Sequence, residues 1–419
     1  MEINKIYCGN SLDVLKTFPS ESVNMIMTSP PYWNLRNYNV ENQLGLESKF
    51  KDYINNLCDI FDEVKRVLRK DGTCWVNMGD TYYGSGKSKK NGSDKINIIG
   101  EETKNTKWKR PSRDNIESMS VIKKCLHCNK EFEGKPSSQF CSRECLNKTS
   151  NEFRKQNREL IDRCLVQIPS RFAIEMCNRG WILRNEIIWH KPNCIPSSAP
   201  SRFTVDFEKI FFFTKSTRIN LWNHKQTNEF VYTQPDFFKE LNKDYYIKTD
   251  EDGIQKKVSF WRSLEYYFNQ QFEPLKEISI KRAKYKWCKN ETRASEYAKL
   301  NGCNADRKIP INPKGRNKRC VWAITTKRAK TNHFATYPED LCITPIKAGC
   351  PENGIVLDPF AGSGTTCVAA KKLNRKYIGI DLNKDYCEAA EKRISNILFA
   401  NIKENINDKS VSENIPPRQ

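Results

Sequence analysis

Six consecutive residues near the start of the chain, Thr28-Ser29-Pro30-Pro31-Tyr32-Trp33, combine a hydroxyl, backbone carbonyls and an aromatic ring at one turn. They follow the apolar residues 23–27, which predict a buried strand of a parallel sheet. Neither proline has an N–H to donate, so the chain leaves the sheet at the carboxyl end of that strand. Open α/β sheets bind ligands at that end. The turn is therefore a candidate catalytic site made of Ser29, Pro30, Pro31 and Tyr32.

These groups suit the methylation of an exocyclic amino group on a base that is flipped out of a duplex. The lone pair of such an amine is delocalised into the ring, so the amine is a poor nucleophile. The Ser29 hydroxyl oxygen and the Pro30 carbonyl can accept its N–H groups and favour a tetrahedral nitrogen, while Tyr32 stacks on the base. The methylated nitrogen is strongly acidic and needs no dedicated strong base. The alternative is a Pro-Pro turn that only ends a core strand, because short motifs match by chance.

A second candidate site lies near the other end of the chain. Residues 355–357 predict a strand, and a glycine-rich turn with the sequence Asp-Pro-Phe-Ala-Gly-Ser-Gly-Thr-Thr follows at residues 358–366. A helix over residues 367–373 and a strand over residues 377–380 lead to Asp381. An acid at that position is placed to accept both hydroxyls of a ribose. The order of strand, turn, helix, strand and acid predicts a cofactor that contains a nucleoside.

Two close pairs of cysteines predict a metal site in the middle of the chain. Cys125 and Cys128 are separated by two residues, twelve residues lie between Cys128 and Cys141, and Cys145 follows Cys141 after three more. This spacing is typical of zinc ligands, and four thiolates make a closed structural site. Four unligated cysteines are the alternative. We expect His127, inside the first pair, to be a bystander.

The composition indicates the class of partner and the compartment. The 419 residues include 71 Lys or Arg against 50 Asp or Glu, and the net charge of +21 favours a polyanion such as nucleic acid. No apolar run approaches the roughly 18 residues of a membrane span, and the start lacks the apolar region of a signal peptide. Seventeen scattered cysteines suggest reduced thiols. We therefore expect a cytoplasmic protein of more than one domain without a membrane partner.

Repeated strand–helix–strand patterns position both candidate sites. Residues 1–33 indicate strand, turn, helix and strand, with Asn10 placed either to cap the helix or to touch a ligand. Helical spacing over residues 50–68 is followed by Gly72, expected just past the helix end, and by a strand over residues 73–78. A helix over residues 161–179 and strands over 181–190 and 209–214 continue the same pattern.

Two stretches interrupt this pattern. Residues 84–124 are rich in Lys, Ser, Asn and Gly and predict an insertion. Residues 221–320 show no sheet rhythm, and residues 276–319 carry fourteen Lys or Arg against four acids. The interleaved aromatic residues Tyr285, Trp287 and Tyr297 favour a segment that reads nucleic acid. A solvated basic face is the alternative.

The chain resembles the S-adenosylmethionine-dependent DNA amino-methyltransferases, which modify cytosine N4 or adenine N6, often within restriction–modification systems. Residues 28–33 and residues 358–366 with Asp381 carry the resemblance. Their order, catalytic turn first and cofactor turn last, is similar to the permuted beta group. Further matches are residues 6–15, 189–215 and 333–338 with the helix that follows.

The resemblance implies a doubly wound, Rossmann-like α/β methyltransferase sheet with permuted motif order, a zinc-binding insertion and a basic target-recognition region. The catalytic half would span residues 1–83 and continue over 160–221, and the cofactor-binding half would span 321–400. The insertion with the zinc site would be 84–159, the recognition region 222–320 and a polar tail 401–419. The residues implied for S-adenosylmethionine are Asn10, His333, Phe334, Asp358, Phe360, Ala361, Gly362, Ser363, Gly364, Thr365 and Asp381.

The motif Ser-Pro-Pro-Tyr is similar to the cytosine-N4 branch, whereas Asp-Pro-Pro-Tyr is the usual adenine form, so adenine N6 is the alternative target. The implied partners are double-stranded DNA with one base flipped out and, where a restriction system is present, a cognate endonuclease. A non-catalytic zinc protein that binds DNA would leave both sheet-end motifs unexplained. A nicotinamide-dependent oxidoreductase would leave Ser29–Tyr32 and the positive charge unexplained.

Overall fold

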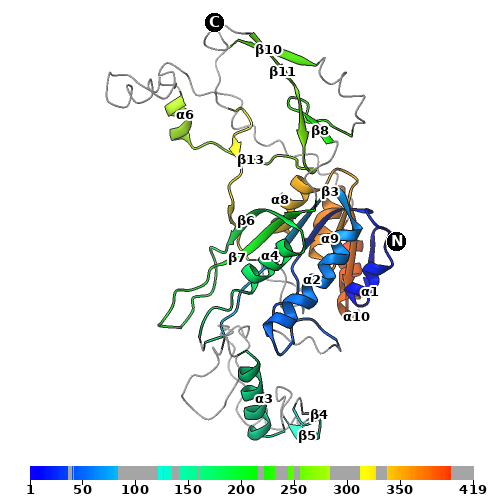
Figure 1. Cartoon of the computed structure of the whole chain (residues 1–419), viewed down its shortest axis with the longest axis vertical. Helices are drawn as coiled ribbons and strands as arrows, with labels where there is room; N and C mark the ends of the chain where they lie inside the picture. Colours follow the sequence, from blue (N-terminus) through cyan, green and yellow to red (C-terminus); the bar gives the residue numbers. More distant parts are fainter. Residues whose placement is uncertain are drawn as a thin grey trace.

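The computed structural model of the protein describes residues 1–35, 40, 42–83, 121–125, 127–134, 141–157, 160–161, 163–215, 221–232, 244–249, 255–283, 312–326 and 337–397. The central body is a mixed α/β domain built on an eight-stranded, mostly parallel sheet (Figure 1). The predicted basic insertion before residue 121, most of the basic segment 276–319 and the tail after residue 397 lie outside the described residues.

The sheet brings strands from the two ends of the chain together. Its order is β1 (Lys5–Cys8), β17 (Lys376–Asp381), β16 (Ile355–Asp358), β2 (Val23–Thr28), β3 (Leu68–Met78), β7 (Phe207–Thr214), β6 (Ile182–His190) and β15 (Val321–Ala323). Neighbouring strands are parallel, except that β7 runs antiparallel to both β3 and β6. Since β16 pairs directly with β2, the two candidate turns follow adjacent strands.

Helices cover both faces of this sheet. The core on one face joins α1 (Ser11–Lys16), α2 (Phe50–Val67) and α4 (Ile168–Asn178) to strand residues such as Ile26. The core on the other face joins α8 (Glu339–Gly349) and α9 (Thr365–Lys372) to Met25 and Met27. Alternate residues of one strand thus serve opposite cores, as expected for a doubly wound sheet. A third cluster packs α10 (Lys384–Ser395) against α9 and β1.

Two predicted helix boundaries differ from the structure. Helix α2 ends at Val67 and β3 begins at once, so Gly72 lies inside a strand and not past a helix end. Pairing with β2 starts already at Leu68, and the extra residues between Leu68 and Thr73 form an irregularity in β3 opposite Val23 and Met25. Helix α4 begins only at Ile168, where Pro169 occupies the first turn and needs no hydrogen-bond acceptor for its nitrogen.

Short antiparallel pairs occupy the region where the sequence shows no sheet rhythm. Strands of two to five residues are too short to display an alternating pattern, which explains why they escape prediction. They are β8 (Leu221–His224), β9 (Phe230–Tyr232), β10 (Tyr245–Thr249), β11 (Gln255–Ser259), β12 (Trp261–Leu264), β13 (Phe272–Glu273) and β14 (Arg316–Asn317), with helix α6 (Glu277–Ala283) after β13.

A separate small unit holds β4 (Val121–Lys124), β5 (Glu131–Gly134) and α3 (Arg143–Gln156), at the opposite end of the molecule from β10 and β11 in Figure 1. The chain leaves the central body after Tyr83 and returns to it at Asn157, whose buried side chain accepts from Phe50 N and donates to the Ser48 carbonyl, and then at Cys164. The exit at Tyr83 and the return at Cys164 are joined by backbone hydrogen bonds from Tyr83 N to the Cys164 carbonyl, 2.9 Å, and from Arg163 N to the Tyr83 carbonyl, 2.7 Å. Among the described residues, no helix has the length and apolar character required to cross a bilayer.

A buried carboxylate joins the neighbouring strands β2 and β16. Asp358 is 1% exposed and accepts hydrogen bonds from Thr28 Oγ1 and Thr366 Oγ1, each 2.6 Å long. The Tyr337 hydroxyl at 3.1 Å and the Phe360 backbone N–H at 3.0 Å complete its shell. Burial raises the pKa of Asp358, and these donors oppose that shift. The ends of two strands that are far apart in sequence are thus fixed to one another.

Thr28→Val tests this junction because it removes one donor from a buried carboxylate while keeping the side-chain shape. We expect the free energy of unfolding to fall by about 1–3 kcal/mol in chemical denaturation. Thr17→Val is the matched control, since the Thr17 hydroxyl donates to the Val14 carbonyl at an exposed position. An equal loss in both variants would contradict a special role for the Thr28–Asp358 bond.

Candidate active site

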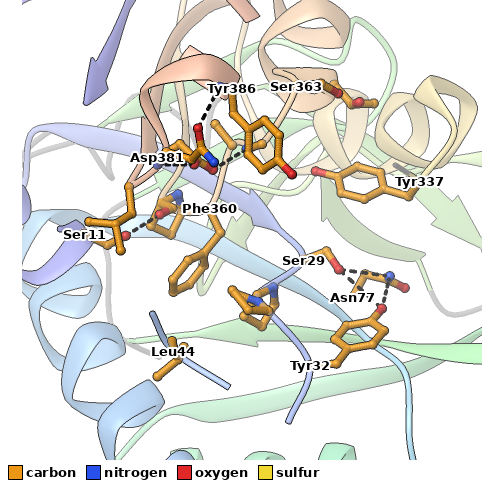
Figure 2. A pocket seen from close by; sticks show the side chains of 18 of the residues that line it. Ser11, Ser29, Tyr32, Leu44, Asn77, Tyr337, Phe360, Ser363, Asp381 and Tyr386 are labelled. Atoms are coloured by element: carbon orange, nitrogen blue, oxygen red, sulfur yellow. Dashed lines mark hydrogen bonds between the residues drawn. The ribbon is translucent and has the colours of Figure 1, made fainter. Parts of the chain in front are cut away.

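A cavity of about 330 Å³ opens at the carboxyl ends of β2 and β16 (Figure 2). The turn after β2 and the turn after β16 both line it, although more than 300 residues separate them in the sequence. Side chains from β3, β6, β7 and the start of α10 complete the wall. One cavity therefore contains the residue types of both candidate sites.

The first turn is held from two sides. The Tyr53 hydroxyl of α2 donates to the Pro31 carbonyl over 2.8 Å. On the other side the Tyr32 ring lies against the backbone of Gly79, where an added Cβ would approach Tyr32 Cε2 to 2.7 Å. Only glycine leaves that space for the ring. The turn is thus fixed by a hydrogen bond and by a close backbone contact.

Five hydrogen-bonded residues form a polar cluster at the first turn: Ser29, Tyr32, Asn77, Lys191 and Glu208. The Tyr32 hydroxyl donates to Glu208 Oε2 over 2.7 Å, and Asn77 Nδ2 donates to the same oxygen over 2.7 Å. The Ser29 hydroxyl donates to Tyr32 Oη over 3.4 Å, and Asn77 Nδ2 lies 3.5 Å from Ser29 Oγ. Lys191 donates to the other oxygen of Glu208. Figure 2 shows Ser29, Asn77 and Tyr32 converging below the second turn.

The electrostatic surroundings keep the Tyr32 hydroxyl protonated. Loss of water on burial is the largest cause that raises the pKa of Tyr32 well above its usual value, and the neighbouring Glu208 carboxylate adds to it. Tyr32 therefore acts as a hydrogen-bond donor to Glu208 and not as a base.

The second turn carries an acid with free accepting capacity. Asp381 Oδ2 accepts from Gly362 N over 2.8 Å, and Oδ1 accepts from Asn383 N over 2.9 Å. Each carboxylate oxygen can accept a further hydrogen bond, and Asp381 lines the cavity. Burial raises the pKa of Asp381, and the two backbone donors partly offset this shift.

The glycine-rich turn also packs closely on α10. Gly364 has φ of 76°, and an added Cβ there would approach Ala390 of α10 to 2.9 Å.

The N-terminal turn joins the same wall. The Asn10 side chain accepts from Leu12 N over 2.9 Å and so caps α1, and Asn10 also lines the cavity. The neighbouring Ser11 hydroxyl donates to the Pro359 carbonyl over 2.6 Å. Capping and a place at the cavity, which the sequence offered as alternatives for Asn10, thus coexist.

The structure brings most of the predicted residues to this cavity. The predicted residues that line it are Asn10, Ser29, Pro30, Pro31, Tyr32, Phe360, Ala361, Gly362, Ser363, Thr365 and Asp381. Asp358 and Gly364 lie behind the wall, because the carboxylate of Asp358 faces Thr28 and Gly364 packs on α10. His333 and Phe334 lie outside the described residues, but Tyr337, which follows them, lines the cavity.

Sequence reasoning missed three polar residues at the site, Asn77, Lys191 and Glu208. Each carries a signal that is visible in the sequence. Asn77 is an amide inside the apolar strand 73–78, and Glu208 precedes the apolar run 210–213. Lys191 directly follows the predicted strand 181–190. A polar residue at the end of a buried strand is a candidate site residue, because burial requires it to have a partner.

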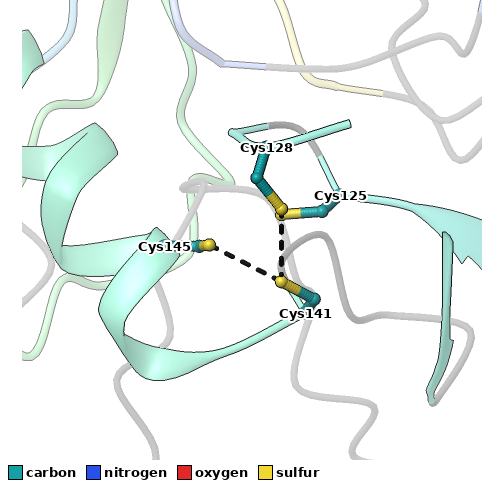
Figure 3. A group of neighbouring side chains, drawn as sticks. All are labelled: Cys125, Cys128, Cys141 and Cys145. Carbon is teal, nitrogen blue, oxygen red and sulfur yellow. Dashed lines mark hydrogen bonds between the residues drawn. The ribbon is translucent and has the colours of Figure 1, made fainter. Parts of the chain in front are cut away.

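The four predicted metal-ligating cysteines lie together (Figure 3). The turn between β4 and β5 supplies Cys125 and Cys128, whereas Cys141 and Cys145 lie just before and within α3. All four sulfur atoms lie within 4.8 Å of one another, and two of the Sγ–Sγ distances are 3.5 Å. Thiolates that share one tetrahedral zinc at about 2.3 Å lie about 3.8 Å apart. His127 Nδ1 lies 3.9 Å from Glu152 and is not part of the cluster.

Comparisons with known proteins give matches over most of the chain. A family model described as DNA methylase matches residues 23–392. The type II methyltransferase M.SfiI of Streptomyces fimbriatus is 28% identical, over 91% of this chain and 88% of that protein. The type II methyltransferase M.Cfr9I of Citrobacter freundii is 30% identical, over 94% and 89%. A putative DNA modification methylase from Thermus thermophilus, solved with S-adenosyl-L-methionine, matches with 16% identity and a TM-score of 0.43, over 94% and 95%.

Proposed function

The chain belongs to the DNA methylase family, and we propose that it methylates N4 of cytosine in double-stranded DNA. Within that family it is an S-adenosylmethionine-dependent DNA amino-methyltransferase of the type found in type II restriction–modification systems. The observation that carries the proposal is the shared cavity, which the Ser29–Tyr32 turn and the turn around Gly362 both line. A methyl donor and a base held at these turns would meet inside one enclosure.

The residues of the second turn fit a nucleoside-containing cofactor. Asp381 offers unused lone pairs to the ribose hydroxyls, and Phe360 contributes an aromatic ring to the same wall. Asn10 and Asn383 add polar atoms near this acid. When bound, S-adenosylmethionine supplies an activated methyl group. The work left to the protein is to hold the acceptor nitrogen in line with that group.

Ser29 is the residue that we assign to the amino group. Its oxygen lines the cavity, and its own hydrogen is donated to Tyr32, so its remaining lone pairs can accept an N–H of the base. Stabilisation of this kind grows as the nitrogen becomes tetrahedral and therefore acts on the chemical step. The half-buried Tyr32 ring is available to stack on the flipped base.

The choice of cytosine rests on Ser29, since the cytosine-N4 branch that the motif resembles has serine at that place. We further propose that the target base leaves the duplex to reach the cavity, because an amino group inside the stack cannot approach Ser29. The relatives M.SfiI and M.Cfr9I are type II methyltransferases by name, which supports a cognate endonuclease as a partner of this chain also.

The cysteine cluster is proposed to hold one structural zinc ion. The four sulfur atoms are already near tetrahedral separation, and no open position is left for a substrate. Its place between β4–β5 and α3 indicates that the ion stabilises this small unit and takes no part in methyl transfer.

The product identifies the target base. Unmethylated plasmid DNA incubated with the protein and S-adenosylmethionine, then digested to nucleosides, should contain N4-methylcytosine on chromatography. N6-methyladenine alone would reverse the choice of base and leave the enzyme class unchanged.

Asp381→Ala should weaken S-adenosylmethionine binding, because the ribose hydroxyls lose a charged acceptor. Hydrogen bonds to charged groups are worth roughly 1.5–3 kcal/mol, so the Kd measured by calorimetry should rise about ten- to a hundredfold. The control is Asp385→Ala, an exposed acid four residues along the chain. Unchanged affinity of Asp381→Ala would remove this residue from the cofactor site.

Elemental analysis of protein purified without chelators should find about one zinc per chain. Cys141→Ser should lose the metal and destabilise the unit around α3, while S-adenosylmethionine affinity stays at the wild-type level. Cys177→Ser, which replaces an exposed thiol on α4, is the control and should keep the zinc. Absence of zinc from the wild-type protein would contradict the site.

A further inference from the structure

Glu208 is the residue on which the polar cluster converges. Its side chain is 15% exposed, and both of its oxygens are engaged. Oε2 accepts from the Tyr32 hydroxyl and from Asn77 Nδ2, each over 2.7 Å, and Oε1 accepts from Lys191. An ionised carboxylate has no hydrogen to give, so every neighbour must point a hydrogen towards it.

This requirement fixes the direction of the next hydrogen bond. The hydrogen of Tyr32 is used on Glu208, which leaves only lone pairs on Tyr32 Oη facing Ser29. The Ser29 hydroxyl at 3.4 Å must therefore be the donor in that contact. Once its hydrogen is turned towards Tyr32, the oxygen of Ser29 presents an acceptor to the cavity.

The side chain of Asn77 gives independent support for the same direction of hydrogen bonding. Its Nδ2 lies within reach of Glu208, Tyr32 and Ser29, whereas its Oδ1 is buried and has no hydrogen-bond partner among the residues that the structure describes. A reversed amide would place its oxygen 2.7 Å from the carboxylate of Glu208 and repel it. The amide oxygen of Asn77 thus stays without a partner among the described residues, so that its N–H groups face Glu208 and the two hydroxyls.

We propose that Glu208 is a positioning residue that sets the direction of the Ser29 and Tyr32 hydrogen bonds and so makes Ser29 an acceptor for the amino group of the target base. This inference deepens the proposed function and rests on it. It holds for cytosine or adenine, because both bases present N–H donors. Lys191 contributes by holding Oε1, which keeps Oε2 turned towards Tyr32.

Glu208→Gln tests the proposal with an almost isosteric side chain. The amide oxygen must face the ammonium of Lys191, so the amide N–H groups face Tyr32. The Tyr32 hydroxyl then accepts from Gln and donates to Ser29, and the Ser29 hydrogen turns into the cavity against the N–H of the base. We expect the single-turnover rate of methyl transfer to plasmid DNA to fall about ten- to a hundredfold, with S-adenosylmethionine affinity within about twofold of wild type.

Asp206→Asn is the matched control. Asp206 lies two residues away, its side chain is 46% exposed, and its carboxylate lies 3.4 Å from His190. Its backbone carbonyl, which the substitution keeps, accepts from Lys191 N over 2.7 Å. This acid-to-amide change should leave the rate at the wild-type level. A Glu208→Gln protein that binds S-adenosylmethionine normally and methylates at the wild-type rate overturns the inference.

Two double variants separate a role through Ser29 from a merely structural one. In a Ser29→Ala background, Glu208→Gln should cost less than about threefold, because the group that it reorients is gone. In a Lys191→Met background it should also cost less than in wild type, since the amide is free to turn its oxygen to Tyr32. Equal costs in all backgrounds would overturn the inference. Absence of methyl transfer by the wild-type protein would instead count against the proposed function.

Discussion

The parallel pairing of β2 with β16 is the constraint on which the site depends. It places the turns that follow Thr28 and Asp358 at one edge of the sheet, and the 2.6 Å hydrogen bond from Thr28 Oγ1 to Asp358 fixes the separation of the two strand ends. Side-chain bonds from Ser11 to Pro359 and from Thr366 to Asp358 extend the same junction. A small shift of β16 against β2 would therefore move the cofactor turn relative to the catalytic turn. Precision at the cavity is set by backbone pairing inside the core.

The sequence was informative wherever local rules decide the outcome. The Pro-Pro turn, the glycine-rich turn, Asp381 and the cysteine spacing each follow from backbone or ligand chemistry within a few residues. The sheet order follows less directly, because it needs the pairing of strands more than 300 residues apart. Gly72 misled the prediction, since glycine ends helices and also fits tightly packed strands. Asn77 and Glu208 could not be paired from sequence, because only the antiparallel alignment of β3 and β7 brings them together.

The polar cluster orients the Ser29 hydroxyl at a cost in folding free energy. A buried amide oxygen on Asn77 without a partner among the described residues, a carboxylate largely removed from water and a tyrosine beside it each oppose folding. The surrounding hydrophobic layers compensate, for example through the stacked pair of Trp75 and Phe212 at 4.1 Å on the neighbouring positions of β3 and β7. Stability from the core thus supports a locally unfavourable arrangement at the site.

Backbone hydrogen bonds join Tyr83 to Arg163 and Cys164, and we call this junction the neck. It bears on how long the chain between these residues can be. The side chain of Asn157 also bonds Ser48 and Phe50 of the central body. Because both ends are fixed in this way, changing the length of the chain between Tyr83 and Asn157 alters mainly the entropy of closing a loop. That entropy grows with the logarithm of length, by about 0.6 kcal/mol for each doubling. A unit as large as β4, β5 and α3 can therefore be gained, lost or exchanged at this point without moving β3 or α4. The neck is a place where the fold tolerates new sequence next to its catalytic edge.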